Sequence, residues 1–209
     1  LRRQRQMCIR DRHKHPQVRV RLHDDYGQNI IERLDNGLAD FGVLVQPTDM
    51  SRYDFLPLPT GDPMGLLMRY DHPLATRESI HPKDLADVPV IVPQGVLNRR
   101  DLSGWYKSGN KELNIVGTMN LLYNASCFVQ EGYGCAICLQ GLVDTSWESG
   151  LVFQPLDPPM QTHLAIAWKK SQPPTPAADA FLTELRSVIA DINRDNKESV
   201  PSPRNGAQR

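Results

Sequence analysis

The residues with spacing suited to chemistry are few, and the clearest pair consists of cysteines. Cys135 and Cys138 form a Cys-x-x-Cys pair, which is the spacing of half a zinc site or of a redox pair. A structural zinc normally needs four ligands, and Cys8 and Cys127 do not form a second such pair. Because residues 134–139 are an apolar run, where a free cysteine acts as a small buried residue, core packing is the favoured interpretation.

The histidines and the nucleophile motifs also give no indication of catalysis. No two histidines are spaced i,i+4, and the six are His13, His15, His23, His72, His81 and His163. The sequence contains no Gly-x-Ser-x-Gly elbow and no glycine-rich phosphate-binding loop. We therefore expect a protein that is not an enzyme and that uses neither a metal nor a cofactor.

Three expected helices begin just after expected strands. Gln28-Asn29 opens the first helix, Leu97-Asn98 the second and Asn120 the third. Helix N-termini carry free N–H groups and favour anions, and ligand crevices in open α/β sheets lie at the carboxyl ends of strands. Ordinary helix capping explains the same residues equally well. From the residues alone, both a binding role and a capping role stay open.

The elements that must position these residues alternate along the chain. Hydrophobic periodicity predicts an α/β protein, and a Pro/Gly-rich crossing at residues 57–63 suggests a second lobe. The first strand, helix and strand form a βαβ unit, whose continuous apolar run at 41–45 indicates a parallel strand buried on both faces. We expect strands at 18–22, 41–45, 64–68, 88–92, 115–116, 135–139 and 164–168, and helices at 28–36, 97–107, 120–131 and 176–192, with one helical turn at 81–86. A polar turn at 24–27 precedes the first helix, Gly37 and Gly132 are expected to end the first and third helices, and Thr175 is expected to cap the last.

Three helices have a clear apolar face. The expected inward residues are Ile30, Ile31, Leu34 and Leu38 in the first, Leu121, Leu122, Ala125, Phe128 and Val129 in the third, and Ala178, Phe181, Leu182, Leu185, Val188, Ile189 and Ile192 in the last.

Composition excludes several classes of function. The 209 residues are 40% hydrophobic and 23% charged, which is typical of a globular chain. Lys+Arg and Asp+Glu are both 24, whereas a module that grips the DNA backbone needs excess positive charge. No run of 18 apolar residues or secretion signal is present, so we expect a cytoplasmic protein with free thiols and no membrane contact.

Six segments follow one another in the order and spacing of a known family. They are 15–20 (HPQVRV), 37–43 (GLADFGV), 71–75 (DHPLA), 85–91 (LADVPVI), 129–137 (VQEGYGCAI) and 177–185 (AADAFLTEL). Together they resemble the effector-binding domain of LysR-type transcriptional regulators, collinearly from about residue 15 to residue 195. The resemblance implies a two-lobed fold of the type 2 periplasmic-binding-protein kind, with the first lobe lacking its first strand and helix. It places lobe I at 16–60 plus 162–195 and lobe II at 61–161, between an atypical basic segment (1–15) and a disordered tail (196–209).

The resemblance also implies a function. A small, anionic effector is expected between the lobes, in contact with Gln28, Asn29, Thr60, Leu97, Asn98, Met119 and Asn120. Relatives usually carry Ser or Thr at the position of Gln28, so the ligand set departs from the usual one there. The regulator would be a dimer or tetramer that binds DNA through an N-terminal helix-turn-helix, which this sequence does not match. A solute-binding protein of a transporter and an enzyme on the same scaffold are the alternatives.

Overall fold

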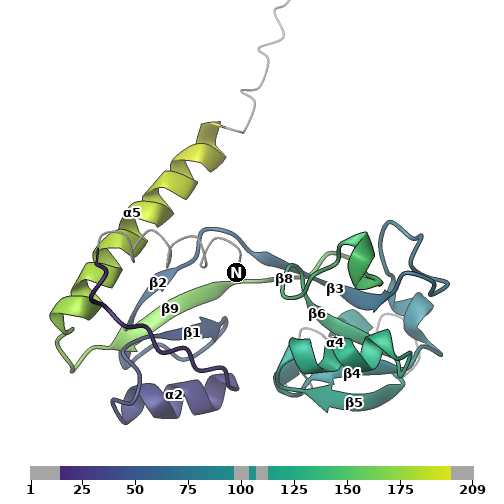
Figure 1. Ribbon diagram of the computed structural model, residues 1–209, viewed down its shortest axis with the longest axis horizontal. Coiled ribbons are helices and arrows are strands. Elements are labelled where there is room, and N and C mark those ends of the chain that lie inside the picture. Colours follow the sequence, from purple (N-terminus) through teal and green to yellow (C-terminus); the bar gives the residue numbers. More distant parts are fainter. Residues whose placement is uncertain (1–14, 97–103, 107–112, 199–209) are drawn as a thin grey trace, which may run out of the picture. The chain divides into compact units, whose positions relative to one another are not determined.

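The computed structural model describes residues 15–96, 104–106 and 113–198 (Figure 1). Residues 21–170 form one compact unit, which holds every strand that the structure describes. The described parts of a second unit are residues 15–20 and 171–198, and they include the long helix α5 (Pro176–Glu198). Among the described residues, no helix is both long enough and apolar enough to cross a membrane.

A three-stranded antiparallel sheet is built from segments far apart in sequence. Its order is β1 (Gly42–Val45), β9 (Leu164–Lys169) and β2 (Tyr53–Pro57). Helix α2 (Gly27–Asp35) packs on it through Leu34, which joins a buried cluster with Leu44, Tyr53 and Ala167. A helix with apolar residues at i, i+3 and i+4 buries that stripe against a sheet, as the sequence pattern predicted for α2.

The C-terminus of α2 follows the sequence prediction closely. Gly37 has a φ of 66°, a left-handed conformation that glycine adopts without steric cost. The Leu38 N–H donates to the Arg33 oxygen at 2.8 Å and the Gly37 N–H to the Leu34 oxygen at 3.1 Å. This pair of bonds satisfies carbonyls that the helix end would otherwise leave unpaired. Leu38 itself, expected on the core face, is 65% exposed because it lies beyond the last helical turn.

The second sheet is mixed and larger. Its main path runs β5 (Ile115–Met119), β4 (Val90–Pro93), β6 (Cys135–Leu139), β3 (Asp62–Arg69) and β7 (Leu151–Pro155), and β8 (Gln161–Thr162) pairs with the start of β3. Strand β4 is parallel to β5 and β6, while β3 is antiparallel to β6, β7 and β8. The strands predicted at 64–68, 88–92, 115–116 and 135–139 are therefore confirmed in this sheet, and the strand at 164–168 is confirmed as β9 of the first sheet, with shifts of a few residues at their ends.

Each face of the second sheet carries its own core. Helix α4 (Leu122–Gln130) contributes Ala125 and Val129 to a cluster that includes Leu67 and Ala136. The opposite cluster contains Leu66 and Ile137 with Leu85, from the predicted helical turn η1 (Pro82–Leu85). Because both faces are covered, the five central residues of β3, Met64–Met68, are all buried.

Two predictions about the first lobe are wrong. Residues 18–22 alternate like a strand but form none, and Leu22 is 86% exposed. A strand needs a partner for its backbone hydrogen bonds, and this segment pairs with none of the described strands. Strand β1 is antiparallel to β9 and buries only alternate residues, so the expected βαβ unit with a fully buried parallel strand does not form.

The predicted helices are confirmed with corrections. Helix α4 ends at Gly132 (φ 79°) as expected, but Leu121 and Phe128 are exposed rather than inward. The Phe128 ring instead packs edge-on against Tyr133, with ring centroids 5.6 Å apart. Of the helix expected at 97–107, the structure describes residues 104–106, which are helical.

Helix α5 begins as predicted, because the Thr175 hydroxyl accepts a bond from the Ala178 N–H at 3.2 Å. Its predicted apolar stripe supplies the buried Ala178, Leu182, Leu185 and Ile189. The helix continues to Glu198, past residue 196, where the tail was expected to begin. Residues 194–198 contain no helix breaker, and the next proline is Pro201.

The cysteine pair is part of the core, as predicted. Cys135 and Cys138 are both buried, and being three apart on β6 they lie on opposite faces, one in each cluster. The two sulfurs therefore cannot share one metal ion. Burial raises the pKa of Cys135 to about 11 and that of Cys138 to about 12.

The contrast between the exposed Cys127 and the buried Cys135 and Cys138 predicts selective thiol labelling. At pH 8 the thiolate fraction of Cys138 is about a thousandfold below that of a thiol with a pKa of 9.0, and burial also blocks the reagent. In a Cys8→Ser background, iodoacetamide is expected to modify the exposed Cys127 in the native protein and Cys135 and Cys138 only in denaturant. Peptide mapping by mass spectrometry reads this directly. Equal modification of Cys127 and Cys138 in the native protein would contradict the buried placement.

Candidate functional site

The first turn of α2 carries two of the predicted effector-contacting residues. Gln28 and Asn29 are both exposed. Asp25 precedes the helix, and its Oδ1 accepts from the Tyr26 N–H and from Asn29 Nδ2, each at 2.8 Å. These two donors hold the pKa of Asp25 below its ordinary value. The turn therefore presents side-chain amides next to an ionised carboxylate.

The ends of β4 and β5 form a second part of the site. The two strands are parallel, with Pro93 beside Met119, so the residues that follow them lie at the same sheet edge. Gln94 follows β4 and is exposed, and Asn120 follows β5 and is exposed. Asn120 Oδ1 accepts from the Leu121 N–H at 2.9 Å, just before α4. Met119 is buried in the cluster beneath α4.

A side-chain hydrogen bond joins these two parts within the unit of residues 21–170. The Tyr26 hydroxyl donates to Gln94 Oε1, across 68 positions of sequence. Tyr26 is the residue before α2, and Gln94 adjoins the β4–β5 edge that carries Asn120. The bond therefore brings the neighbourhood of Gln28 and Asn29 to the neighbourhood of Met119 and Asn120.

Thr60 lies in the connection between β2 and β3, where the chain passes from one sheet to the other, and is exposed. Beside it, Gly61 is tightly enclosed, since a Cβ there would lie 2.9 Å from Gln161 Oε1 and 3.2 Å from the His163 ring. Strand β8 pairs with β3 at this point and leads into β9. Two chain segments thus pass between the sheets side by side. Leu97 and Asn98 lie outside the described residues.

Sequence reasoning missed Asp25, Tyr26 and Gln94. Asp25 lies in the polar turn expected before α2, and its bond to Asn29 spans only four positions of the sequence. The Tyr26–Gln94 bond has no local signal, because its partners lie 68 positions apart in the sequence. Among the described residues, no three His, Cys, Asp or Glu side chains gather as metal ligands.

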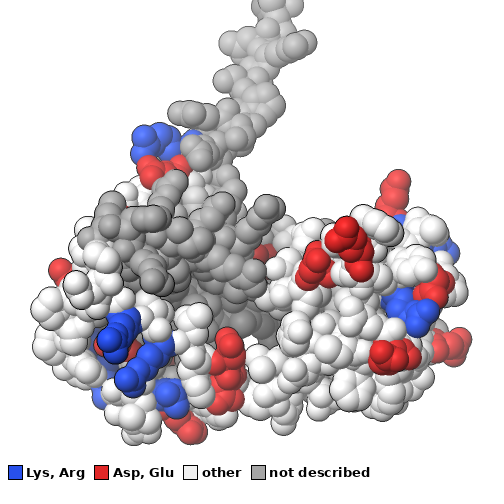
Figure 2. All heavy atoms as spheres, viewed as in Figure 1, with Lys and Arg blue, Asp and Glu red and all other residues white. Residues whose placement is uncertain are grey.

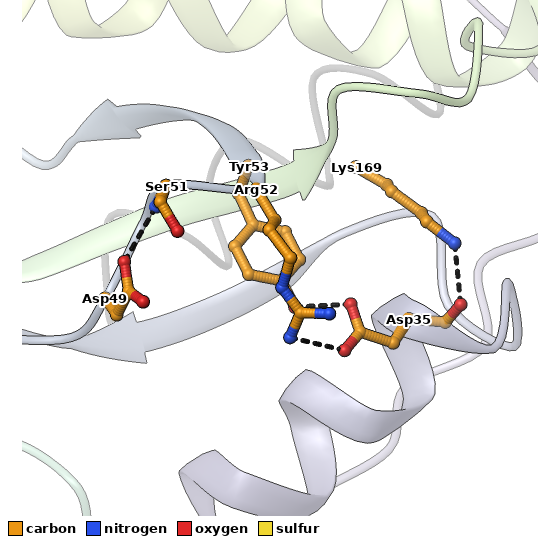
Figure 3. Close-up of polar contacts among 6 residues, drawn as sticks. All are labelled: Asp35, Asp49, Ser51, Arg52, Tyr53 and Lys169. Carbon is orange, nitrogen blue, oxygen red and sulfur yellow. Dashed lines mark hydrogen bonds and ion pairs between the residues drawn. The ribbon is translucent and has the colours of Figure 1, made fainter.

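A polar network anchors α2 at the end opposite the site (Figure 3). The buried Tyr53 donates from its hydroxyl to Asp35 Oδ1 at 2.5 Å, and Arg52 pairs with Asp35 Oδ2 at 2.8 Å. Lys169 Nζ donates to the Asp35 backbone oxygen at 2.7 Å, so β9 also holds the helix end. The network fixes α2 on the sheet and with it the position of Gln28 and Asn29.

The Asp35 network predicts a pH-dependent contribution to stability. The Tyr53 hydrogen bond, followed by the Arg52 charge, lowers the pKa of Asp35 below 3.8. A carboxylate with a depressed folded-state pKa stabilises the fold above its unfolded pKa, and this contribution is lost as pH falls through the folded pKa. Asp35→Asn is therefore expected to lower the melting temperature at pH 7, and by progressively less as pH falls below 3.8.

Differential scanning calorimetry of the two proteins from pH 7 to pH 2 measures this difference. Asp54→Asn is the matched control, because Asp54 is an exposed carboxylate on β2 near the network. This control is expected to shift the melting temperature little. If Asp35→Asn lowered the melting temperature equally at pH 7 and at pH 2, the charge of Asp35 would contribute nothing to stability.

The described surface has no broad region of one charge on the face drawn in Figure 2. Acidic and basic side chains form small separate groups among uncharged residues there. This distribution agrees with the balance of 24 basic and 24 acidic residues. A backbone-gripping DNA site needs a basic stripe or patch, and the described residues visible on this face form none.

Comparison with known proteins identifies relatives along most of this chain. The family described as the LysR substrate binding domain matches residues 9–190. The HTH-type transcriptional regulator YvbU of Bacillus subtilis is 26% identical over 177 residues, covering 84% of this chain and 59% of the regulator. This chain therefore spans about three fifths of the length of that relative.

Two solved structures show the same fold. The effector-binding domain of QuiR, in complex with shikimate, has a TM-score of 0.73 at 18% identity, covering 91% of this chain and 90% of that one. The regulatory domain of CcmR from Synechocystis PCC6803, in complex with 2-PG, has a TM-score of 0.73 at 19% identity, covering 89% of both chains. These likenesses confirm the predicted two-lobed, periplasmic-binding-protein-like fold. With a family match over 9–190 and the six collinear segments, this chain belongs to the LysR substrate-binding domain family.

Proposed function

We propose that this chain is the effector-sensing domain of a LysR-type transcriptional regulator. A small metabolite binds between the lobes, in contact with Gln28, Asn29, Thr60, Met119 and Asn120 and with Leu97 and Asn98. The observation that carries this proposal is the Tyr26–Gln94 hydrogen bond, because it brings the predicted residues of α2 and of the β4–β5 edge into one neighbourhood. Exposed amides in such a place suit the recognition of a polar metabolite.

The nature of the effector is supported by two structural neighbours. QuiR is described with shikimate and CcmR with 2-PG, and both ligands are small metabolites. We place a ligand of this class between the lobes, which are joined by two neighbouring chain segments near Thr60. Binding would favour a closed arrangement of the lobes, and through it alter the regulator's hold on DNA.

The lobe boundaries belong to the same proposal. Lobe I comprises residues 16–60 and 162–195, and lobe II comprises residues 61–161. The sheets support this division, since β1, β2 and β9 form one and β3 to β8 form the other. The two crossings fall at Gly61 and at Thr162, where β3 and β8 pair.

The other roles follow from the regulator assignment. We propose that the full regulator binds DNA through a helix-turn-helix, assembles into dimers or tetramers and is cytoplasmic. We do not propose a catalytic activity. The curated relatives are HTH-type transcriptional regulators, which favours this role over a solute-binding protein of a transporter. Among the described residues that we propose as effector contacts, the exposed polar groups are amides and the Thr60 hydroxyl, which suit ligand recognition. The neighbouring Asp25 carboxylate is engaged by the Tyr26 N–H and by Asn29.

A thermal-shift screen of metabolites tests the proposal. A binding compound is expected to raise the melting temperature saturably. Gln28→Ala and Asn120→Ala are each expected to raise its dissociation constant about threefold to tenfold, the effect of one lost hydrogen bond. Asn114→Ala is the matched control, because Asn114 precedes β5 whereas Asn120 follows it. A broad screen without any binding compound, or equal losses in Asn114→Ala and Asn120→Ala, would count against this site.

A further inference from the structure

Two of the proposed effector-contacting residues are asparagines whose amides are already oriented by the protein. An amide has a donating NH2 end and an accepting oxygen, and a fixed partner at one end determines what the other end offers. Asn29 and Asn120 have their fixed partners at opposite ends of the amide. The two residues therefore offer different chemistry to a ligand.

On the α2 side, the NH2 end of Asn29 is engaged. Asn29 Nδ2 donates to Asp25 Oδ1 at 2.8 Å, and because an ionised carboxylate only accepts, the amide cannot be turned the other way. The Asn29 oxygen consequently faces away from Asp25 and is available as an acceptor. Asp25 also places a negative charge at this end of the site, and His23 Nε2 lies 3.6 Å from its Oδ2. An acidic group is disfavoured here, whereas a hydroxyl or ammonium is favoured.

On the β5 side, the oxygen end of Asn120 is engaged. Asn120 Oδ1 accepts from the Leu121 N–H at 2.9 Å, and a backbone N–H only donates, so this amide is also fixed. The exposed Asn120 NH2 group is left to donate. Among the described residues, no acidic side chain forms a hydrogen bond or ion pair with it. A carboxylate or another acceptor is favoured at this end.

From these two orientations we infer that the site is polarised and takes a small hydroxy acid or amino acid, with the acid group toward Asn120 and the hydroxyl or ammonium toward Asn29 and Asp25. This inference rests on the proposed function and narrows its ligand class. An effector with acid groups at both ends is disfavoured by Asp25, and a polyol lacks the acceptor that Asn120 would bind.

Four classes of small compound distinguish these cases by isothermal titration calorimetry with the whole chain. They are hydroxy and amino acids such as shikimate and serine, unsubstituted acids such as cyclohexanecarboxylate, polyols such as inositol, and diacids such as 2-phosphoglycolate. The tightest binders are expected among the hydroxy and amino acids. Asn120→Asp is expected to weaken these at least about tenfold, because it replaces the donating NH2 with a carboxylate.

Two further variants complete the test. Asp25→Asn removes the charge of the side chain and keeps its shape. This variant is expected to reduce severalfold the ratio between the affinity for hydroxy acids and the affinity for diacids. Asn114→Asp makes the same charge change as Asn120→Asp at the other end of β5, about 20 Å away, and is expected to change affinity less than twofold. Tightest binding by diacids or polyols would overturn the polarity and leave effector binding intact. Binding by none of the four classes would overturn the proposed function and the polarity together.

Discussion

Replacing Gly65 with alanine is expected to lower the free energy of unfolding by about 3 kcal/mol, which is a large part of the stability of an ordinary domain. Gly65 lies in the middle of β3, between β6 and β7. A Cβ there would lie 2.2 Å from Phe153 Cζ and 2.4 Å from the Gln154 backbone oxygen. The ring could rotate away, but the oxygen belongs to a strand paired with β3, so relief requires the ladder itself to shift.

Gly117→Ala is the matched control for this experiment. Gly117 lies in β5 of the same sheet, and the nearest atoms to its added Cβ are side-chain carbons of Ile91 at 3.8 and 3.9 Å. This substitution is expected to change the unfolding free energy by less than about 1 kcal/mol, because the added methyl group meets only ordinary van der Waals contacts and alanine restricts the unfolded chain. Urea unfolding followed by circular dichroism measures both. Equal midpoints for the two variants would mean that β7 does not lie against Gly65 as described.

Leu66→Ala is expected to cost about 2–5 kcal/mol, the range for a leucine truncated in a packed core. Leu66 is completely buried, and its cluster brings together β3, β4, β6 and η1. Removing its side chain leaves a cavity that the surrounding strands cannot fill, because their ladders hold them in place. The denaturant midpoint should fall with little change in the slope of the transition.

Leu38→Ala is the control, since the sequence pattern predicts Leu38 on the apolar face of the first helix whereas the structure exposes it. Leu38 is 65% exposed, and the bond that it makes at the end of α2 comes from its backbone N–H, which alanine retains. The expected loss is less than about 0.5 kcal/mol, as for other surface substitutions. If Leu38→Ala were as destabilising as Leu66→Ala, the end of α2 would have to be packed differently.

Local patterns in the sequence were sufficient where the structure depends on nearby residues. The stop of α2 at Gly37, the end of α4 at Gly132 and the Thr175 cap of α5 each involve a few neighbouring residues, and each was predicted. The buried strands β3 and β6 were also predicted, because long apolar runs have few alternatives to burial.

Predictions failed where the outcome depends on partners far away in the sequence. Residues 18–22 have the alternation of a strand but no described neighbour to pair with, and β1 pairs with β9, more than 110 positions later. Phe128 is apolar and helical, yet the apolar stripe of α4 is narrower than its hydrophobic residues suggest, so the ring lies against Tyr133 instead.

The same distinction applies to the candidate site. Gln28, Asn29 and Asn120 were proposed from helix starts and family resemblance, both of which the sequence carries. The Tyr26–Gln94 bond and the orientation of the two asparagine amides depend on the folded chain. The sequence therefore located the amides but did not indicate which end of each one faces a ligand.

Backbone amide NMR during titration with a compound from the thermal-shift screen tests effector binding at this site most directly. Saturable chemical-shift changes are expected to cluster at residues 25–29, 60–61 and 119–121, and the Gln94 signal should move as its bond to Tyr26 responds. Changes confined to the outer face of α4, around Tyr123 and Phe128, or to β7, would contradict effector binding at this site.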